Sequence, residues 1–311
     1  MARIGSSDLD VLPLNLGGNV FGWTADSATS FAVLDAFVAG GGSFVDTADV
    51  YSQWVEGNSG GESETILGDW IARRGNRADV VVATKVGQWA DRPGTSRGAV
   101  RAAIDGSLKR LQTDYVDLYY AHTDDQDTPL EETVAALGEV VAEGKARYVG
   151  ASNFTADRLA EALRIADELG VARFVALQPH YNLVHRDEYE GALADLAVRE
   201  DIGVLPYSSL ASGFLTGKYR EGGPAVDSPR AGGASRYLDE RGRRVLAALD
   251  EVAAGHGTSA TAVSLAWLRA RPGVAAPIAS ARTVDQLPDL LAGARLELTT
   301  DEVQALTDVS A

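Results

Sequence analysis

Four polar residues, Asp46, Tyr51, Lys85 and His122, have the types and spacing of a proton-transfer site. Three of them close short apolar runs typical of buried strands, and Tyr51 follows Asp46 in the loop that leaves the first run. An α/β barrel keeps its active site at the C-terminal ends of its strands. We therefore expect the four side chains to converge at one end of such a barrel. The three runs are residues 43–46, 80–85 and 116–122.

The chemistry of this group suits protonation of a substrate oxygen. A phenol with an ordinary pKa of about 10 is a weak acid at neutral pH. We expect the Lys85 cation to lower the pKa of Tyr51, and Asp46 to hold Lys85 in place. A neutral His122 could donate a hydrogen bond to the same oxygen. No side chain donates hydride, so carbonyl reduction here implies a nicotinamide or flavin cofactor. The plainer alternatives are a structural Lys85–Asp46 salt bridge and an ordinary packed tyrosine.

Composition restricts the possible partners and compartments. The chain has 311 residues and a formal net charge of −16, and such acidity disfavours nucleic acid and membranes as partners. The absence of cysteine excludes disulfides and thiolate chemistry. The four histidines form no His-x-x-x-His pair, so we expect no metal. Neither a signal peptide nor a membrane-spanning run is present, which predicts a cytoplasmic protein.

Eight β-branched runs alternate with helical patterns, which predicts an α/β fold: one (β/α)8 TIM barrel domain over residues 1–311. A doubly wound sheet is the alternative, but its Gly-x-Gly-x-x-Gly motif fails at 17–22 because Asn19 holds the middle glycine position. Thr128 predicts a capped start for a helix over 129–143. The predicted strands lie near 13–17, 43–46, 80–85, 116–121, 147–151, 174–178, 203–207 and 274–278. Further predicted helices are 28–39, 97–111, 156–169 and 259–270.

Loops over the predicted barrel mouth carry three tryptophans, which indicate an apolar or aromatic substrate pocket, with ordinary packing as an equal alternative. A glycine-rich loop at 221–236 follows the seventh predicted strand. This loop could equally well be a lid over a ligand or an ordinary surface loop. The tryptophans are Trp23, Trp54 and Trp89.

Several ordered blocks along the chain resemble the aldo-keto reductase superfamily, in particular its bacterial NADPH-dependent oxidoreductases. These blocks are 44–51, 61–64, 83–85, 115–118, 144–154, 178–182 and 206–208. The resemblance implies a (β/α)8 barrel that binds NADP(H) without a Rossmann domain. It also implies that Tyr51 is the general acid–base residue, that Lys85 and Asp46 support it, and that His122 orients the carbonyl group.

The same resemblance implies a set of coenzyme contacts. Ser152, Asn153 and Gln178 match residues that hold the nicotinamide carboxamide, whose amide needs both a donor and an acceptor. Tyr207 matches the aromatic residue that stacks on the nicotinamide ring. After the seventh strand, one stretch matches the segment that wraps the pyrophosphate. Its matching residues are Ser208, Leu210, Ser212 and Lys218.

Near the C-terminus, Ser280, Arg282 and Gln286 match the segment that binds the adenosine 2′-phosphate and adenine. Arg282 favours NADP over NAD, because a guanidinium clamps phosphate bidentately. Two positions depart from the family pattern, with Ser280 where glycine is usual and Leu290 where asparagine is usual. Leu290 cannot hydrogen-bond adenine, so this contact must be made differently or lost.

The sequence thus predicts NADPH-dependent reduction of a small aldehyde or ketone, by a monomer or homo-oligomer. Two alternatives stay open. One is a coenzyme-sensing regulatory subunit like the aldo-keto-reductase-type β-subunits of potassium channels, with little turnover. The other is a barrel hydrolase or isomerase without redox chemistry.

Overall fold

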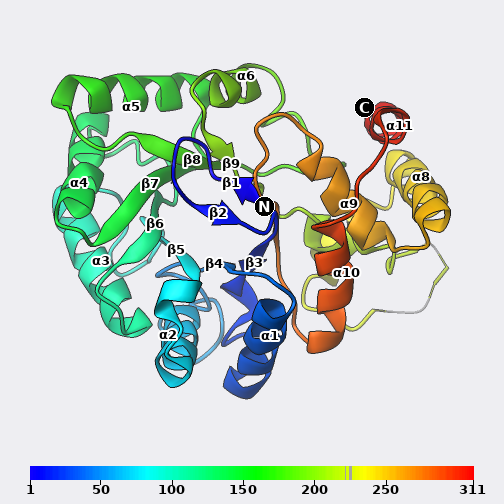
Figure 1. The fold of residues 1–311 in the computed structure, drawn as a ribbon, viewed down its shortest axis with the longest axis horizontal. Helices are drawn as coiled ribbons and strands as arrows, with labels where there is room; N and C mark the ends of the chain where they lie inside the picture. Colours follow the sequence, from blue (N-terminus) through cyan, green and yellow to red (C-terminus); the bar gives the residue numbers. More distant parts are fainter. Residues whose placement is uncertain (221, 224–225) are drawn as a thin grey trace.

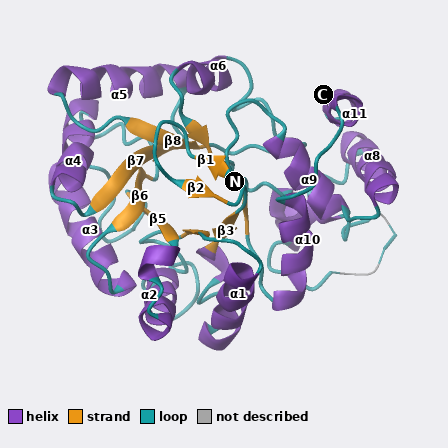
Figure 2. Cartoon of the chain, in the orientation of Figure 1, coloured by secondary structure: helices purple, strands orange, loops and turns teal. Residues whose placement is uncertain are grey.

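Eight parallel strands form the centre of the molecule in a computed structural model that describes residues 1–220, 222–223 and 226–311 (Figures 1 and 2). Their order in the sheet is β10-β3-β4-β5-β6-β7-β8-β9. The strands are β3 (Asn15–Gly17), β4 (Phe44–Asp46), β5 (Val81–Val86), β6 (Val116–Ala121), β7 (Ala146–Ser152), β8 (Phe174–Gln178), β9 (Gly203–Val204) and β10 (Ile278–Ala279).

The sheet closes on itself through the chain segment that enters β10. The Val204 N–H donates to the Gly273 carbonyl at 2.8 Å, and the Ala275 N–H donates back to the Val204 carbonyl at the same distance. Closure of eight parallel strands makes a barrel, so the predicted (β/α)8 fold is confirmed. The seventh and eighth strands are shorter than predicted, because Pro206 and Pro277 have no N–H for a ladder.

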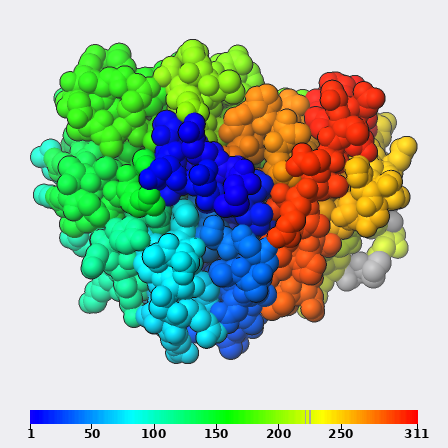
Figure 3. Space-filling model, viewed as in Figure 1, coloured from blue at the N-terminus to red at the C-terminus, as the bar shows by residue number. Residues whose placement is uncertain are grey.

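An antiparallel hairpin that the sequence did not predict, β1 (Ala2–Arg3) with β2 (Asp10–Val11), covers the N-terminal end of the barrel. Figure 3 shows this N-terminal segment, in dark blue, across the middle of that face. Gly5 makes the contact possible, because a Cβ there would lie 2.5 Å from the carbonyl oxygens of Val175 and Asp201. With this end covered, the opposite end of the barrel is left for a ligand.

Helices surround the barrel, and most begin at a side-chain cap, such as Thr155 before α5. The predicted cap at Thr128 is wrong: α4 starts after Pro129 without a side-chain cap. No helix among the described residues combines the length and hydropathy needed to cross a membrane. The α-helices are α1 (Ser27–Ala39), α2 (Glu62–Arg74), α3 (Arg97–Leu111), α4 (Leu130–Ala142), α5 (Ala156–Leu169), α6 (Ala192–Arg199), α7 (Ala231–Ser235), α8 (Glu240–His256), α9 (Ala260–Arg269), α10 (Leu287–Gly293) and α11 (Thr300–Val309).

Candidate active site

The two-residue period of the strands brings the predicted catalytic residues together. Phe44, Ala83 and Tyr120 belong to the small apolar cluster that also contains Ile4 and Leu9 of the hairpin region, whereas Val45 and Val82 pack in the larger cluster beneath the helices. Side chains alternate along a strand. Asp46, Lys85 and His122 lie two residues beyond Phe44, Ala83 and Tyr120, so they point to the same interior side at the C-terminal end.

Lys85 is the centre of the hydrogen-bonded group. Its side chain is fully buried, and its ammonium donates to Asp46 Oδ2 at 2.5 Å, to the Thr47 carbonyl at 2.7 Å and to Tyr51 Oη at 2.9 Å. These three bonds use all the donors of an ammonium group. The Tyr51 hydroxyl in turn donates to Asp46 Oδ2 at 3.2 Å. The side chains therefore meet as the sequence predicts, while the roles assigned to them stay predictions.

The expectation of a lowered tyrosine pKa is wrong for this structure. Desolvation raises the pKa of Tyr51 well above its ordinary value, and the negative charge and hydrogen bond of Asp46 raise it further. Burial also lowers the pKa of Lys85, although Asp46 opposes that shift. Tyr51 is therefore a neutral phenol at pH 7, and the Lys85 contact acts on the phenolate only once a proton has left.

His122 lies beside this group as a neutral imidazole. Burial, and then the charge of Lys85, lower its pKa well below the ordinary value. Its ring centroid is 6.0 Å from that of Tyr51, and its Nδ1 is buried without a hydrogen-bond partner among the described residues. The Asn153 amide donates to the His122 carbonyl at 2.9 Å, which ties the end of β6 to the end of β7.

The residues predicted to hold the nicotinamide carboxamide also bond one another. The Gln178 amide donates to Asp46 Oδ1 at 2.9 Å, a link to the catalytic group that the sequence did not reveal. The Ser152 hydroxyl donates to the Gln178 carbonyl at 2.9 Å, and the Tyr207 hydroxyl donates to Asn153 Oδ1 at 2.8 Å. One network therefore connects the predicted coenzyme platform to the predicted proton donor.

A cleft of about 590 Å³ opens over this network, a size typical of small-molecule and cofactor sites. Asp46, Tyr51 and His122 line it, with Lys85 behind them. The residues predicted to contact coenzyme all line it as well. They are Ser152, Asn153, Gln178, Tyr207, Ser208, Leu210, Ser212, Lys218, Ser280, Arg282 and Gln286.

Three cationic side chains line the cleft of this acidic protein. Lys218, Arg230 and Arg282 line it, and none of the three forms an ion pair with a described residue. Burial and the neighbouring Arg282 lower the pKa of Arg230. Unpaired cations in a cleft favour an anionic ligand, because the half-buried Arg230 and Arg282 are otherwise partly desolvated without a counter-ion, whereas Lys218 is exposed. These residues thus fit a dinucleotide phosphate chain, with the exposed Asp285 and Asp289 as opposing charges at the Arg282 end.

The sequence missed Arg230 because the glycine-rich segment at 221–236, predicted as a loop, has no regular pattern to orient its side chains; in the structure Arg230 directly precedes α7. Residues 221, 224 and 225 of that loop lie outside the described part of the chain. Its described part contributes Ser228, Pro229 and Arg230 to the cleft wall. These three residues could therefore contact a ligand in the cleft, as the residues of a lid would, while the role of the segment as a lid stays a prediction.

Of the three predicted pocket tryptophans, only Trp23 lines the cleft. Trp54 packs edge-on against Trp23 at 5.6 Å and against Tyr51 at 6.2 Å, and half of its surface is exposed at the mouth. Trp89 faces elsewhere: its indole N–H donates to the Ser59 carbonyl, and the Arg110 guanidinium lies over its ring. The placement of Trp89 in the substrate pocket is therefore not supported, because these loop contacts hold its ring outside the cleft.

Comparison with known proteins identifies the family. The model of the "Aldo/keto reductase family" matches residues 13–311. The chain belongs to the aldo/keto reductase family. "Protein tas" of Escherichia coli (strain K12) is 34% identical to this chain, in an alignment that covers 99% of this chain and 97% of the relative. "Norsolorinic acid reductase B" of Aspergillus parasiticus is 33% identical, with 97% of this chain and 81% of the relative covered. "Probable voltage-gated potassium channel subunit beta" of Oryza sativa subsp. japonica is 36% identical, with 92% of this chain and 88% of the relative covered. Membership supports an oxidoreductase that reduces carbonyl groups, in a family that generally uses NAD(P)H.

Proposed function

We propose that this protein reduces an aldehyde or ketone to the alcohol with NADPH, and that Tyr51 is the general acid. The observation that carries the proposal is the contact of 2.9 Å between the buried Lys85 ammonium and the Tyr51 hydroxyl. When bound, NADPH supplies the hydride that the carbonyl carbon receives. The protein's part is to place the carbonyl group, to exclude water and to provide one proton to the oxygen.

Tyr51 provides that proton. Its hydroxyl is neutral at pH 7 and lies in the cleft wall. As the proton passes to the substrate oxygen, negative charge develops on Tyr51 Oη, where the Lys85 ammonium already donates a hydrogen bond. Asp46 keeps that ammonium in position through the 2.5 Å bond. Such a pre-arranged charge stabilises the transition state more than the ground state, as catalysis requires.

His122 orients the carbonyl oxygen. Because its imidazole is neutral, it can donate one N–H to that oxygen without competing with Tyr51 as the acid. The Asn153 bond to the His122 backbone fixes the ring relative to the coenzyme platform. Trp23 would then form an apolar wall for the substrate, with Trp54 packed edge-on against it.

The predicted coenzyme residues would hold NADP(H) along the cleft. Tyr207 would pack on the nicotinamide, and Lys218 would meet the pyrophosphate beside the left-handed turn at Ser212, whose φ is 58°. Arg282 would take the 2′-phosphate, which favours NADP over NAD. Ser280 bonds Asn19 at 2.7 Å, and Leu290 is buried in the cleft wall. The adenine would therefore meet an apolar surface at Leu290 rather than an amide.

Turnover measurements test this function. Purified protein should oxidise NADPH, followed by absorbance, with a reactive substrate such as a nitrobenzaldehyde, and NADPH should quench its tryptophan fluorescence. Turnover with NADH should be slower at equal concentration. Failure of NADPH to bind would remove the proposal and favour a barrel enzyme without redox chemistry. The assignment of residues 1–311 to a single domain stays a prediction that limited proteolysis would test.

A regulatory role is the second candidate, because the Oryza relative named as a probable potassium channel subunit is 36% identical over 92% of this chain. In that case the protein would bind NADPH but turn over a broad carbonyl panel negligibly, and a membrane partner would co-purify with it. Substantial turnover without such a partner would favour the enzyme.

A further inference from the structure

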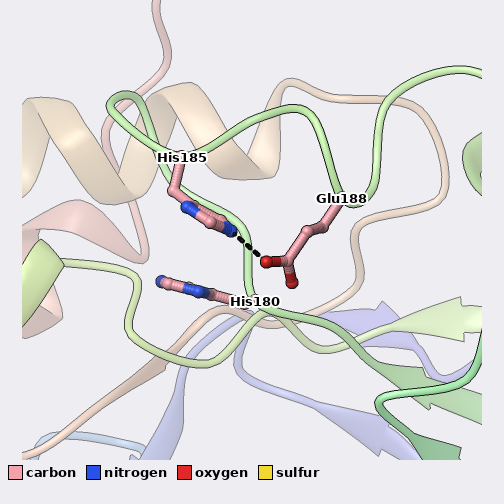
Figure 4. A group of neighbouring side chains, drawn as sticks. All are labelled: His180, His185 and Glu188. Atoms are coloured by element: carbon pink, nitrogen blue, oxygen red, sulfur yellow. Dashed lines mark ion pairs between the residues drawn. The ribbon is translucent and has the colours of Figure 1, made fainter.

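Three flat rings form a column beside the cleft, and none of the four predicted catalytic residues is part of it. The Tyr207 and His180 rings stack with centroids 5.2 Å apart and planes at 15°, and His180 stacks on His185 at 3.6 Å and 16°. Figure 4 shows the two imidazoles lying parallel, with the Glu188 carboxylate beside His185. One face of Tyr207 is thus occupied by His180, which leaves the other face for a ligand in the cleft.

The backbone explains why the column forms. The Tyr207 N–H donates to the Pro179 carbonyl at 2.9 Å, which brings His180 alongside Tyr207 in a parallel bridge. Asn182 and His185 then exchange backbone hydrogen bonds of 3.0 Å each, so the chain turns back and places the second imidazole over the first. His185 Nε2 also lies 2.9 Å from a Glu188 carboxylate oxygen.

A metal ion is the obvious alternative ligand of this cluster, since donor atoms of His180, His185 and Glu188 lie within 4.8 Å of one another. The stacking argues against a formed metal site. The lone pair of an imidazole nitrogen lies in the plane of its ring. Two parallel rings therefore cannot both direct their lone pairs at one ion between them.

We propose that His180 is a positioning residue for Tyr207, and that the column of Tyr207, His180 and His185 sets the affinity for the coenzyme by presenting a rigid ring to the nicotinamide. This inference rests on the proposed function and adds a residue to it. Stacking limits rotation of Tyr207, so little ordering entropy is lost when a second flat ring packs on its free face.

The charge state of His180 suits this role. His185, Glu188 and Arg236 are the charged or titratable groups that act on His180, and burial with the nearby His185 and Arg236 lowers its pKa to about 4, against a weaker opposing effect of Glu188. His180 is therefore neutral at pH 7, and two imidazoles can stack closely without mutual repulsion. Beyond the column, the Tyr207 hydroxyl bonds Asn153, whose amide bonds the His122 carbonyl.

Replacing His180 with residues that keep or remove the flat ring tests the proposal. We expect His180→Ala and His180→Leu to weaken NADPH binding about tenfold, and His180→Phe to stay within about twofold of wild type, because only phenylalanine can restore the stack. Fluorescence titration gives the Kd, and circular dichroism checks the fold. His256→Ala is the matched control, because His256 bonds Glu302 outside the cleft lining.

Kinetics separate positioning from general damage. At saturating NADPH, His180→Leu should keep kcat near the wild-type value while KM for NADPH rises, because the proton donor is untouched. An unchanged Kd in His180→Leu, or a His180→Phe variant as weak as His180→Leu, would overturn the proposal. Wild-type protein that does not bind NADPH would instead refute the proposed function itself, so the two failures are distinct.

Discussion

Asp49 gives a prediction that does not depend on the substrate. The residue is 1% exposed, and neither carboxylate oxygen has a hydrogen-bond partner among the described residues. Burial, followed by repulsion from Glu64, raises its pKa to about 7, although Arg110, the Val50 backbone N–H and Lys85 oppose the shift. Glu64 already forms an ion pair with Arg110 at 2.7 Å, so Asp49 is the carboxylate left without its own counter-ion.

The shifted pKa of Asp49 makes the free energy of unfolding depend on pH. In the unfolded chain Asp49 ionises near its ordinary pKa of 3.8, whereas in the native protein it keeps its proton up to about pH 7. The native state therefore binds more protons across this window, and its stability falls as pH rises from about 4 to about 7. Relative to a pH well below 3.8, these two pKa values lower the free energy of unfolding by about 2 kcal/mol at pH 5 and by about 4 kcal/mol at pH 8.

Asp49→Asn removes this titration while keeping the shape of the side chain. The free energy of unfolding of the variant, relative to wild type, should rise by about 2–3 kcal/mol between pH 5 and pH 8. Urea denaturation at several pH values measures it, with the exposed Asp91→Asn as the control. If the stability of Asp49→Asn ran parallel to that of wild type from pH 5 to pH 8, the assignment of a buried, protonated Asp49 would be incorrect.

Two other predictions concern the charges around the cleft. Lys85→Met leaves Asp46 buried without its cation, so the free energy of unfolding should fall by about 3–5 kcal/mol, and adding Asp46→Asn should restore much of that stability but no turnover. Urea denaturation and NADPH oxidation measure both effects, and turnover in the double variant would contradict the role of the ion pair. Arg282→Ala should raise KM for NADPH about tenfold and leave KM for NADH nearly unchanged, because only NADPH carries the 2′-phosphate. If KM rose equally for NADPH and NADH, Arg282 would not be the residue that binds the 2′-phosphate.

The arrangement of the catalytic residues could be predicted from the sequence because it depends on periodicity. Apolar runs that end in Asp46, Lys85 and His122 identify buried strands, and parallel strands in a barrel end on the same side. The pairing register between neighbouring strands was not needed for this prediction, because each polar residue lies on the interior side of its own strand. The family resemblance then supplied the coenzyme residues, which line the cleft in the structure.

Features that depend on packing between distant segments could not be predicted in this way. Gln178 bonds Asp46 across the barrel, and Trp89 is held outside the cleft by Ser59 and Arg110. The pKa of Tyr51 moved opposite to expectation, because the degree of desolvation cannot be read from neighbouring residues in the chain. His185 reaches His180 only through a turn whose hydrogen bonds are set by the fold.

The central claim is that Tyr51 donates the proton while Lys85, held in place by Asp46, stabilises the charge left behind, and Tyr51→Phe tests it most directly. The ring remains, so NADPH affinity from fluorescence titration should stay within about twofold of wild type, while carbonyl turnover should fall at least about 100-fold, the usual contribution of a general acid. Turnover in Tyr51→Phe close to that of wild type, with NADPH bound equally well, would contradict the account.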